Sequence, residues 1–83
     1  MEKLFEIRRE KFEGEWRDPD RKVLGLIVGE DNAKAYLKKL AEKENLRKNE
    51  VVWNDFCECW VVGDMYGVEY LAIERKVLNI EDL

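Results

Sequence analysis

Cys57 and Cys59 are the residues whose type and spacing first suggest chemistry. They are the only cysteines in the chain, and one residue separates them. They lie in a stretch that is typical of a strand, where residues two apart point to the same side of the sheet. A metal site would need more ligands, and the sequence has no histidine and no third cysteine. We therefore predict two buried, reduced thiols that pack as small hydrophobic side chains.

Missing residue types restrict the chemistry further. The chain contains no serine, threonine, glutamine or histidine. Without a Ser or Thr hydroxyl and without an imidazole base, Ser-His-Asp and Cys-His mechanisms are excluded. Carboxylates are numerous and a pair of them could act as acid and base in a hydrolase, but their spacing selects no pair. The sequence thus predicts a protein that is not an enzyme and needs no cofactor, with a carboxylate hydrolase as the lowest-ranked alternative.

A charged loop at residues 14–21 carries the first candidate binding surface. Trp16 has no apolar neighbour in this loop, and Arg17 and Arg21 follow it. Trp and Arg are enriched among the residues that anchor protein interfaces. Trp16 either folds back onto the sheet or stands exposed as such an anchor, and the sequence favours neither. Tyr66, at the tip of a second loop, is another candidate for partner binding.

Glu58 is unusual because it lies between the two cysteines in an otherwise apolar segment. On the predicted strand, Phe56 and Trp60 share its face. A carboxylate among apolar side chains needs a compensating partner. We therefore predict that Glu58 and Trp60 belong to an interface.

A basic stripe offers an alternative function. On the predicted helix it comprises Lys34, Lys38, Lys39 and Lys43. Lysines could hold the phosphates of a nucleotide-like ligand, with Trp53 stacking on its base. The chain would then be a homo-oligomer that binds or sequesters such a ligand. The simpler interpretation is a solvated helix face, which pairs such as Lys38 with Glu42 stabilise.

The elements that would position these residues follow from hydrophobic periodicity. Residues 3–13 alternate as a half-buried strand, and residues 22–29 form a continuous apolar run that is typical of a central strand. These two strands should form a hairpin. Two further strand segments, at residues 56–62 and 68–78, flank a glycine-bounded loop, and residues 51–53 form a short additional strand segment.

The segment between the strands predicts one helix, from an N-cap at Asp31 to about Asn45. Asn45 followed by Leu46 fits a left-handed C-cap with an apolar contact. Apolar residues recur at the spacing of one buried face, which comprises Ala33, Tyr36, Leu37, Leu40 and Ala41.

Together these elements predict a single α+β domain over residues 1–83. Its mostly antiparallel sheet has four to five strands in the order β-β-α-β-β, with one helix packed on one face. The second face would carry Trp, Phe and β-branched side chains without a cover. The sequence therefore predicts a homo-oligomer or a protein partner on that face.

Charge and hydropathy bear on the compartment. The net charge is −4, which disfavours nucleic acid as a partner. Charged residues interrupt the first segment at once and no apolar run reaches membrane-spanning length, so we expect a cytoplasmic protein with no membrane contact.

The stretch from Val28 to Leu40, with the hairpin that follows it, resembles a pattern found in small phage and mobile-element α+β proteins. In them an acidic turn after a strand leads into a helix of the Ala-x-x-Tyr-Leu type. The resemblance implies a viral setting, in which such proteins act by stoichiometric binding. Some inhibit host defence enzymes and others sequester nucleotide signals. Our leading hypothesis is therefore a non-catalytic, phage-type inhibitor of a protein partner.

Overall fold

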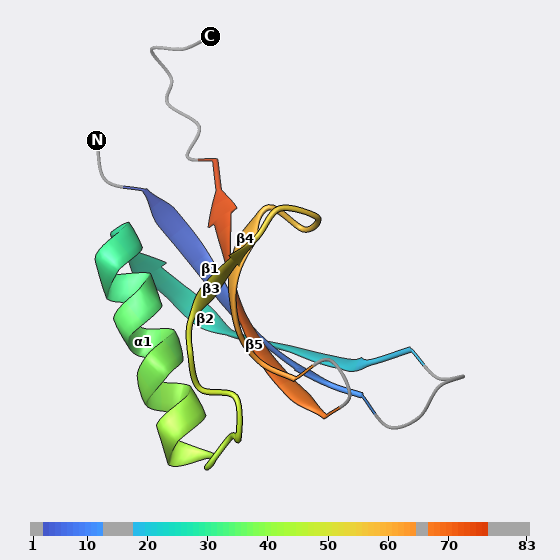
Figure 1. The fold of residues 1–83 in the computed structure, drawn as a ribbon. Helices are drawn as coiled ribbons and strands as arrows, with labels where there is room; N and C mark the ends of the chain where they lie inside the picture. Colours follow the sequence, from blue (N-terminus) through green and yellow to red (C-terminus); the bar gives the residue numbers. More distant parts are fainter. Residues whose placement is uncertain (1–2, 13–17, 65–66, 77–83) are drawn as a thin grey trace, which may run out of the picture.

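The computed structural model describes residues 3–12, 18–64 and 67–76, and it has one sheet and one helix (Figure 1). The sheet has five strands in the order β2-β1-β5-β4-β3, and all of its pairings are antiparallel. The helix packs against one face, which confirms the predicted α+β class. The elements are β1 (Leu4–Lys11), β2 (Asp20–Val28), α1 (Glu30–Lys43), β3 (Val52–Asn54), β4 (Cys59–Gly63) and β5 (Val68–Arg75).

β1 is an inner strand of the sheet, between β2 and β5. The hairpin of β1 with β2 is confirmed, but the prediction that the second strand is central is wrong, because β2 forms an edge. Its apolar run predicted burial on both faces, whereas Val23, Leu26 and Val28 are 56%, 63% and 46% exposed. β5 pairs with the side of β1 that faces away from β2, so no second described strand lies beside β2.

Helix α1 begins two residues earlier than predicted. Gly29, not Asp31, is the N-cap residue, and no side chain caps the helix. Glu30 and Asp31 lie in the first turn, where carboxylates interact favourably with the helix dipole. The C-terminus confirms the sequence prediction. Asn45 has a φ of 56°, and the N–H groups of Asn45 and Leu46 donate to the carbonyls of Glu42 and Ala41, which is a Schellman motif.

The main core lies between α1 and the sheet. Three helix residues at a spacing of four, Ala33, Leu37 and Ala41, are fully buried against the sheet. Leu40 packs at the margin of this core, but Tyr36 is 43% exposed, so its predicted burial is wrong. The strand residues that complete the buried cluster are Phe5, Ile7, Val62, Tyr70 and Ala72.

The opposite face of the sheet differs from the prediction of an uncovered aromatic surface. Trp60 pairs with Ala72 across the sheet, so it lies on the helix face, not on the open one. On the open face, Cys59, Val61 and Leu71 form a second buried cluster. Beside this cluster, Glu6 binds Arg8 and Arg75, and the hydrogen bonds from these guanidinium groups lower the pKa of Glu6.

A second ionic group joins the end of α1 to the sheet. Glu44 accepts a hydrogen bond from Arg9 at 2.7 Å and another from the Tyr70 hydroxyl. The Arg9 guanidinium lowers the pKa of Glu44, and it prevails over partial burial, which acts in the opposite direction. Glu69 behaves differently, because burial and the neighbouring carboxylates raise its pKa.

These shifts predict how stability depends on pH. At a pH above the raised pKa of Glu69, the charged and partly buried carboxylate destabilises the fold. Protonation of Glu69 relieves this effect as the pH falls through that pKa. The lowered pKa values of Glu6 and Glu44 give stability that is complete above the unfolded value of about 4.3 and is lost at lower pH. The free energy of unfolding in urea should therefore be highest between the unfolded pKa of about 4.3 and the raised pKa of Glu69, and fall at lower pH.

The matched pair of variants for this prediction is Glu44→Gln and Glu42→Gln. Glu42 is an exposed residue of the same helix. Glu44→Gln should reduce the loss of stability in acid by on the order of 1 kcal/mol, since the charge-assisted bond to Arg9 is removed. Equal acid profiles for the two variants would contradict the assignment.

In the described part of the chain, no helix has the length and apolar composition needed to cross a membrane.

Candidate functional site

Three local features determine the conformation of the turn between β3 and β4, residues 55–58. The Asn54 side-chain oxygen accepts hydrogen bonds from the N–H groups of Phe56 and Cys57, at 2.9 and 3.3 Å. Asn side chains frequently hold turns in this way. Glu58 then adopts a left-handed backbone conformation, with a φ of 53°. A disulfide between Cys57 and Cys59 closes the turn.

This turn corrects two predictions from the sequence. The cysteines are not a pair of buried thiols, because Cys57 is exposed in the turn, Cys59 is buried in β4, and the two are bonded to each other. Glu58 does not lie on a strand between Phe56 and Trp60. The strand begins only at Cys59, because Asn54 draws the preceding residues into a turn.

The turn presents one large apolar side chain to solvent. Phe56 is 100% exposed, more than any other large hydrophobic residue of the described chain. Trp53, at the base of the turn, is 45% exposed, and its indole N–H donates to the Asp55 carboxylate at 2.8 Å. Figure 1 shows this turn projecting from the sheet beyond the ends of β3 and β4. We refer to Trp53 and residues 55–58 as the aromatic turn.

An open hollow of about 440 Å³ lies beside the aromatic turn, and three of its four lining residues are acidic. Asp55 and Glu58 come from the turn, and Glu74 comes from the end of β5. The surface around Trp53 therefore combines an aromatic ring with several negative charges.

Behind this surface, Trp53 packs edge-on against Trp60 with ring centroids 5.2 Å apart. Trp60 is held from the helix side. Its indole N–H donates to Glu30 at 3.0 Å, and the Lys34 ammonium lies 4.3 Å from its ring centroid. These contacts tie the base of the aromatic turn to the first turn of α1.

The predicted partner-binding residues are only partly brought together. Glu58 lies in the aromatic turn, and Trp60 packs behind it. Arg21 lies on β2, where it pairs with Glu10 at 3.1 Å. Trp16, Arg17 and Tyr66 fall outside the residues that the structure describes.

The predicted lysine stripe does not form one site. Lys34 covers Trp60, and Lys38 donates to the Asn49 carbonyl at 2.9 Å, which fastens the segment after the helix. Lys39 is exposed, and Lys43 lines a different hollow next to Glu44 and Tyr70. Of these lysines, only Lys34 contacts the aromatic pair that includes Trp53.

The sequence analysis did not select Phe56 as a candidate site residue, because its segment was assigned to a strand. Asn54-Asp55 predicts a break in the chain at this point, since both residues favour turns, but not that the turn extends as far as Glu58. Within residues 3–12, 18–64 and 67–76, no group of three or more Cys, Asp or Glu side chains is arranged to hold a metal. The arrangement instead suits docking, because a closed turn presents an apolar ring with acidic neighbours.

Comparison with models of known protein families, with curated proteins and with solved structures gives no match to this chain.

Proposed function

We propose that this chain is a non-catalytic binding protein that docks onto a protein partner through the aromatic turn. The observation that carries the proposal is the complete exposure of Phe56 on a turn closed by a disulfide. A fully exposed Phe gains nothing from the fold of its own chain, and its transfer into an apolar pocket contributes roughly 1.5–3 kcal/mol.

The closed turn favours affinity in a second way. Binding orders mobile loops and side chains at a free-energy cost, and a preorganised loop reduces that cost. The Asn54 hydrogen bonds and the Cys57–Cys59 disulfide restrict the backbone on both sides of Phe56 before any partner arrives.

The charges around the turn indicate the chemistry of the partner. Asp55, Glu58 and Glu74 surround the hollow beside Trp53. A complementary surface would offer an apolar pocket for Phe56 with Lys or Arg side chains at its rim. Rim charges of this kind accelerate association and make it sensitive to salt.

The more specific form of the proposal is a phage-type inhibitor that binds a host defence enzyme stoichiometrically, as the resemblance to such proteins implies. The cytoplasm is its expected compartment. Because cytoplasmic thiol systems reduce exposed disulfides, the Cys57–Cys59 bond would there be open to reduction, and partner binding should be compared with and without reductant.

The test is photocrosslinking from position 56. A photoreactive phenylalanine analogue at this site should form a one-to-one adduct with a single protein in the source cells. Unlabelled wild-type protein should compete for that adduct. Phe56→Ala should compete roughly 30-fold less well, as expected for loss of an anchor worth about 2 kcal/mol.

Val52→Ala is the matched control. Val52 is also exposed and lies next to Trp53, but it points to the opposite face of β3. It should compete as well as the wild type does. Equal competition by Phe56→Ala and the wild type would contradict the proposal, provided that both fold, as measured by circular dichroism.

The alternative functions have less support from the geometry. A nucleotide stacked on Trp60 would have to displace Lys34 from its ring, and a base stacked on Trp53 would meet the acidic side of the turn. The carboxylates of the aromatic turn surround an open hollow, without a buried acid–base pair that would favour a hydrolase.

A further inference from the structure

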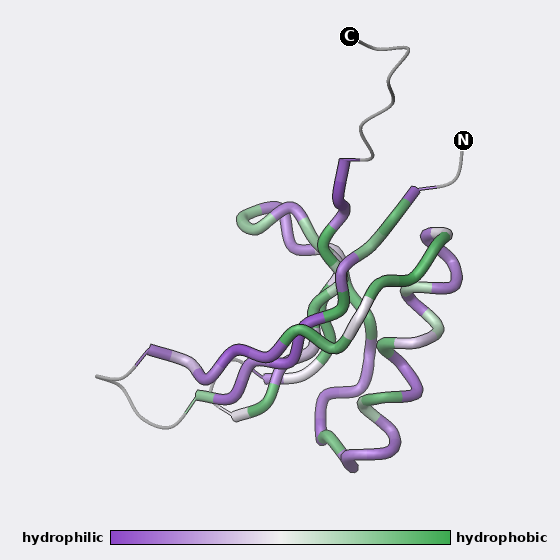
Figure 2. Tube along the Cα trace, turned by 180° about the vertical axis from the view of Figure 1, so that it is seen from behind, coloured by the Kyte–Doolittle hydropathy of each residue, from purple (hydrophilic) through white to green (hydrophobic). Residues whose placement is uncertain are grey.

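The outer edge of β2 is a second surface, at a distance from the aromatic turn. Among the strands that the structure describes, β2 has a neighbour on one side only, and its second half exposes Leu24, Leu26 and Val28. Figure 2 shows this hydrophobic stretch running along the outside of the sheet. An apolar edge strand of this length is a template for pairing with another chain, and proteins that keep such an edge free usually protect it with charges or proline.

The backbone of this edge has free hydrogen-bonding groups. The Gly29 N–H donates to the Lys3 carbonyl at 2.7 Å, which fixes the direction of the ladder between the two strands. Because peptide groups alternate along an antiparallel strand, those of Leu26 and Val28 point away from β1. The Val28 carbonyl is taken by the Asn32 side chain at 3.0 Å, whereas the Leu26 N–H and carbonyl face outward.

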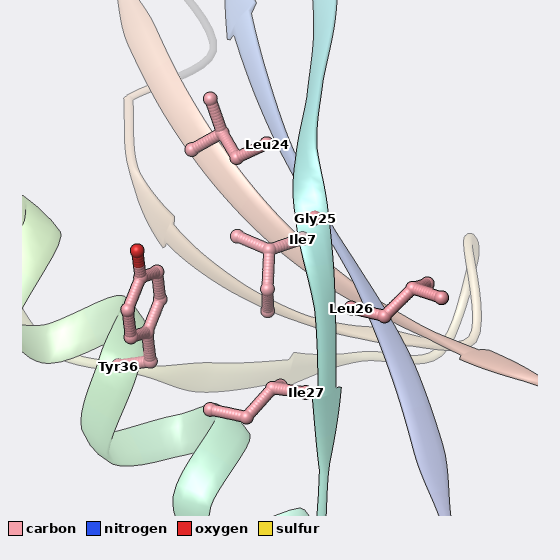
Figure 3. A pocket seen from close by; sticks show the side chains of 6 residues that line it. All are labelled: Ile7, Leu24, Gly25, Leu26, Ile27 and Tyr36. Carbon is pink, nitrogen blue, oxygen red and sulfur yellow. The ribbon is translucent and has the colours of Figure 1, made fainter.

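An apolar pocket of about 160 Å³ opens beside this edge on the helix face (Figure 3). Gly25 leaves it without a side chain, and Tyr36 borders it from α1. A bulge places Leu24 between the paired residues Val23 and Gly25, so that Leu24 also points toward Tyr36, while Leu26 points to the other face. An apolar cavity of roughly this size accommodates a benzene-sized group.

The charges along the edge of β2 are self-complementary, because its start is basic and the residues after its end are acidic. Arg21 and Lys22 lie near the start of β2, and Glu30 and Asp31 follow its end. Asp20, the one acidic residue at the start, lies opposite Lys11 of β1. If a second β2 runs antiparallel beside the first, the basic start of each strand meets the acidic end of the other.

We propose that two copies of this chain associate through their β2 edges, antiparallel and about a two-fold axis close to Leu26. The sheet then continues from one copy into the other, and each Ile27 lies opposite the Gly25 of its partner, at the mouth of the pocket that Tyr36 borders. A two-fold pairing also closes the exposed edge, because each copy covers the edge of the other.

The first test is sedimentation of the full chain with changes at the axis. The wild type should sediment as a dimer at micromolar concentration. Leu26→Lys places two ammonium groups opposite each other at the axis and should weaken the dimer more than about tenfold. Val52→Lys puts the same charge on the other edge strand, at a residue that is also exposed, and should leave the dimer intact.

A charge reversal is the sharper test, because it changes exposed polar residues only. Lys22→Glu alone sets a new carboxylate close to Glu30 and Asp31 of the second copy at both ends of the interface, and Asp31→Lys alone sets an ammonium group close to Arg21 and Lys22 of that copy. Each variant should dimerise about tenfold more weakly than the wild type. An equimolar mixture should form a heterodimer, in which both ends again pair opposite charges.

Three results would overturn the proposal: a wild-type monomer at millimolar concentration, a dimer that Leu26→Lys leaves unchanged, or variants that do not recover on mixing. Circular dichroism of each variant separates loss of pairing from loss of fold. The outcome is independent of the aromatic turn, since Phe56→Ala should dimerise as the wild type does.

Discussion

Replacing Leu37 with alanine should lower the free energy of unfolding by about 2–5 kcal/mol. Leu37 is fully buried in the middle of α1, between Ala33 and Ala41, and it is among the largest completely buried side chains of the described chain. The two buried residues one turn away on the helix are alanines, which are too small to fill the space that the leucine leaves.

The effect is large in relation to the whole fold. A domain of this size has only a few kcal/mol of net stability, so the variant should be substantially unfolded near room temperature. Urea denaturation followed by circular dichroism measures it. Lys39→Ala changes an exposed position on the same helix and should alter stability by less than about 0.5 kcal/mol. Similar midpoints for the two variants would show that α1 is not the main cover of the sheet.

A second large loss of stability is expected for Gly63→Ala. Gly63 ends β4 with a φ of 111°, a conformation that residues with a side chain rarely adopt. An added Cβ would lie 2.4 Å from the Val68 carbonyl oxygen. That oxygen accepts the Asp64 N–H bond that closes the hairpin of β4 and β5. Backbone strain alone contributes roughly 1–3 kcal/mol, and the steric contact with the carbonyl adds to it.

Gly67→Ala is the matched control, because it lies in the same hairpin. An added Cβ there meets no atom within 4 Å, and its backbone is outside the left-handed region. It should leave the thermal midpoint nearly unchanged, whereas Gly63→Ala should lower it by several degrees or more. Equal midpoints would mean that the hairpin adjusts its backbone without strain.

The sequence predicted those parts of the fold that depend on neighbouring residues. The helix, its end at Asn45 and the hairpin of β1 with β2 all follow from local signals, and the structure confirms them. The position of β2 at the edge could not be predicted in this way, because it depends on which distant strand pairs with β1. An apolar run such as that of residues 22–29 is typical of a buried strand even when no neighbour covers it.

The candidate site shows the same limit on a smaller scale. Alternating apolar residues around Cys57 and Cys59 are typical of a strand, and this periodicity concealed the turn. The hydrogen bond that the Asn54 side-chain oxygen accepts from the Phe56 N–H and the left-handed conformation of Glu58 determine the local structure instead. The exposure of Phe56 follows from these two features, and hydrophobic periodicity carries no information about either.

The place of β1 between β2 and β5 also determines the order in which the chain can fold. The hairpins β1–β2, β3–β4 and β4–β5 join segments that are adjacent in sequence, so each can form with little loss of loop entropy. The pairing of β1 with β5 joins the two ends of the described chain and must wait until nearly all of it is available. We therefore expect closure of that ladder to be the slow step of folding. In a chain still being synthesised, the side of β1 that pairs with β5 would stay unpaired until β5 has been made.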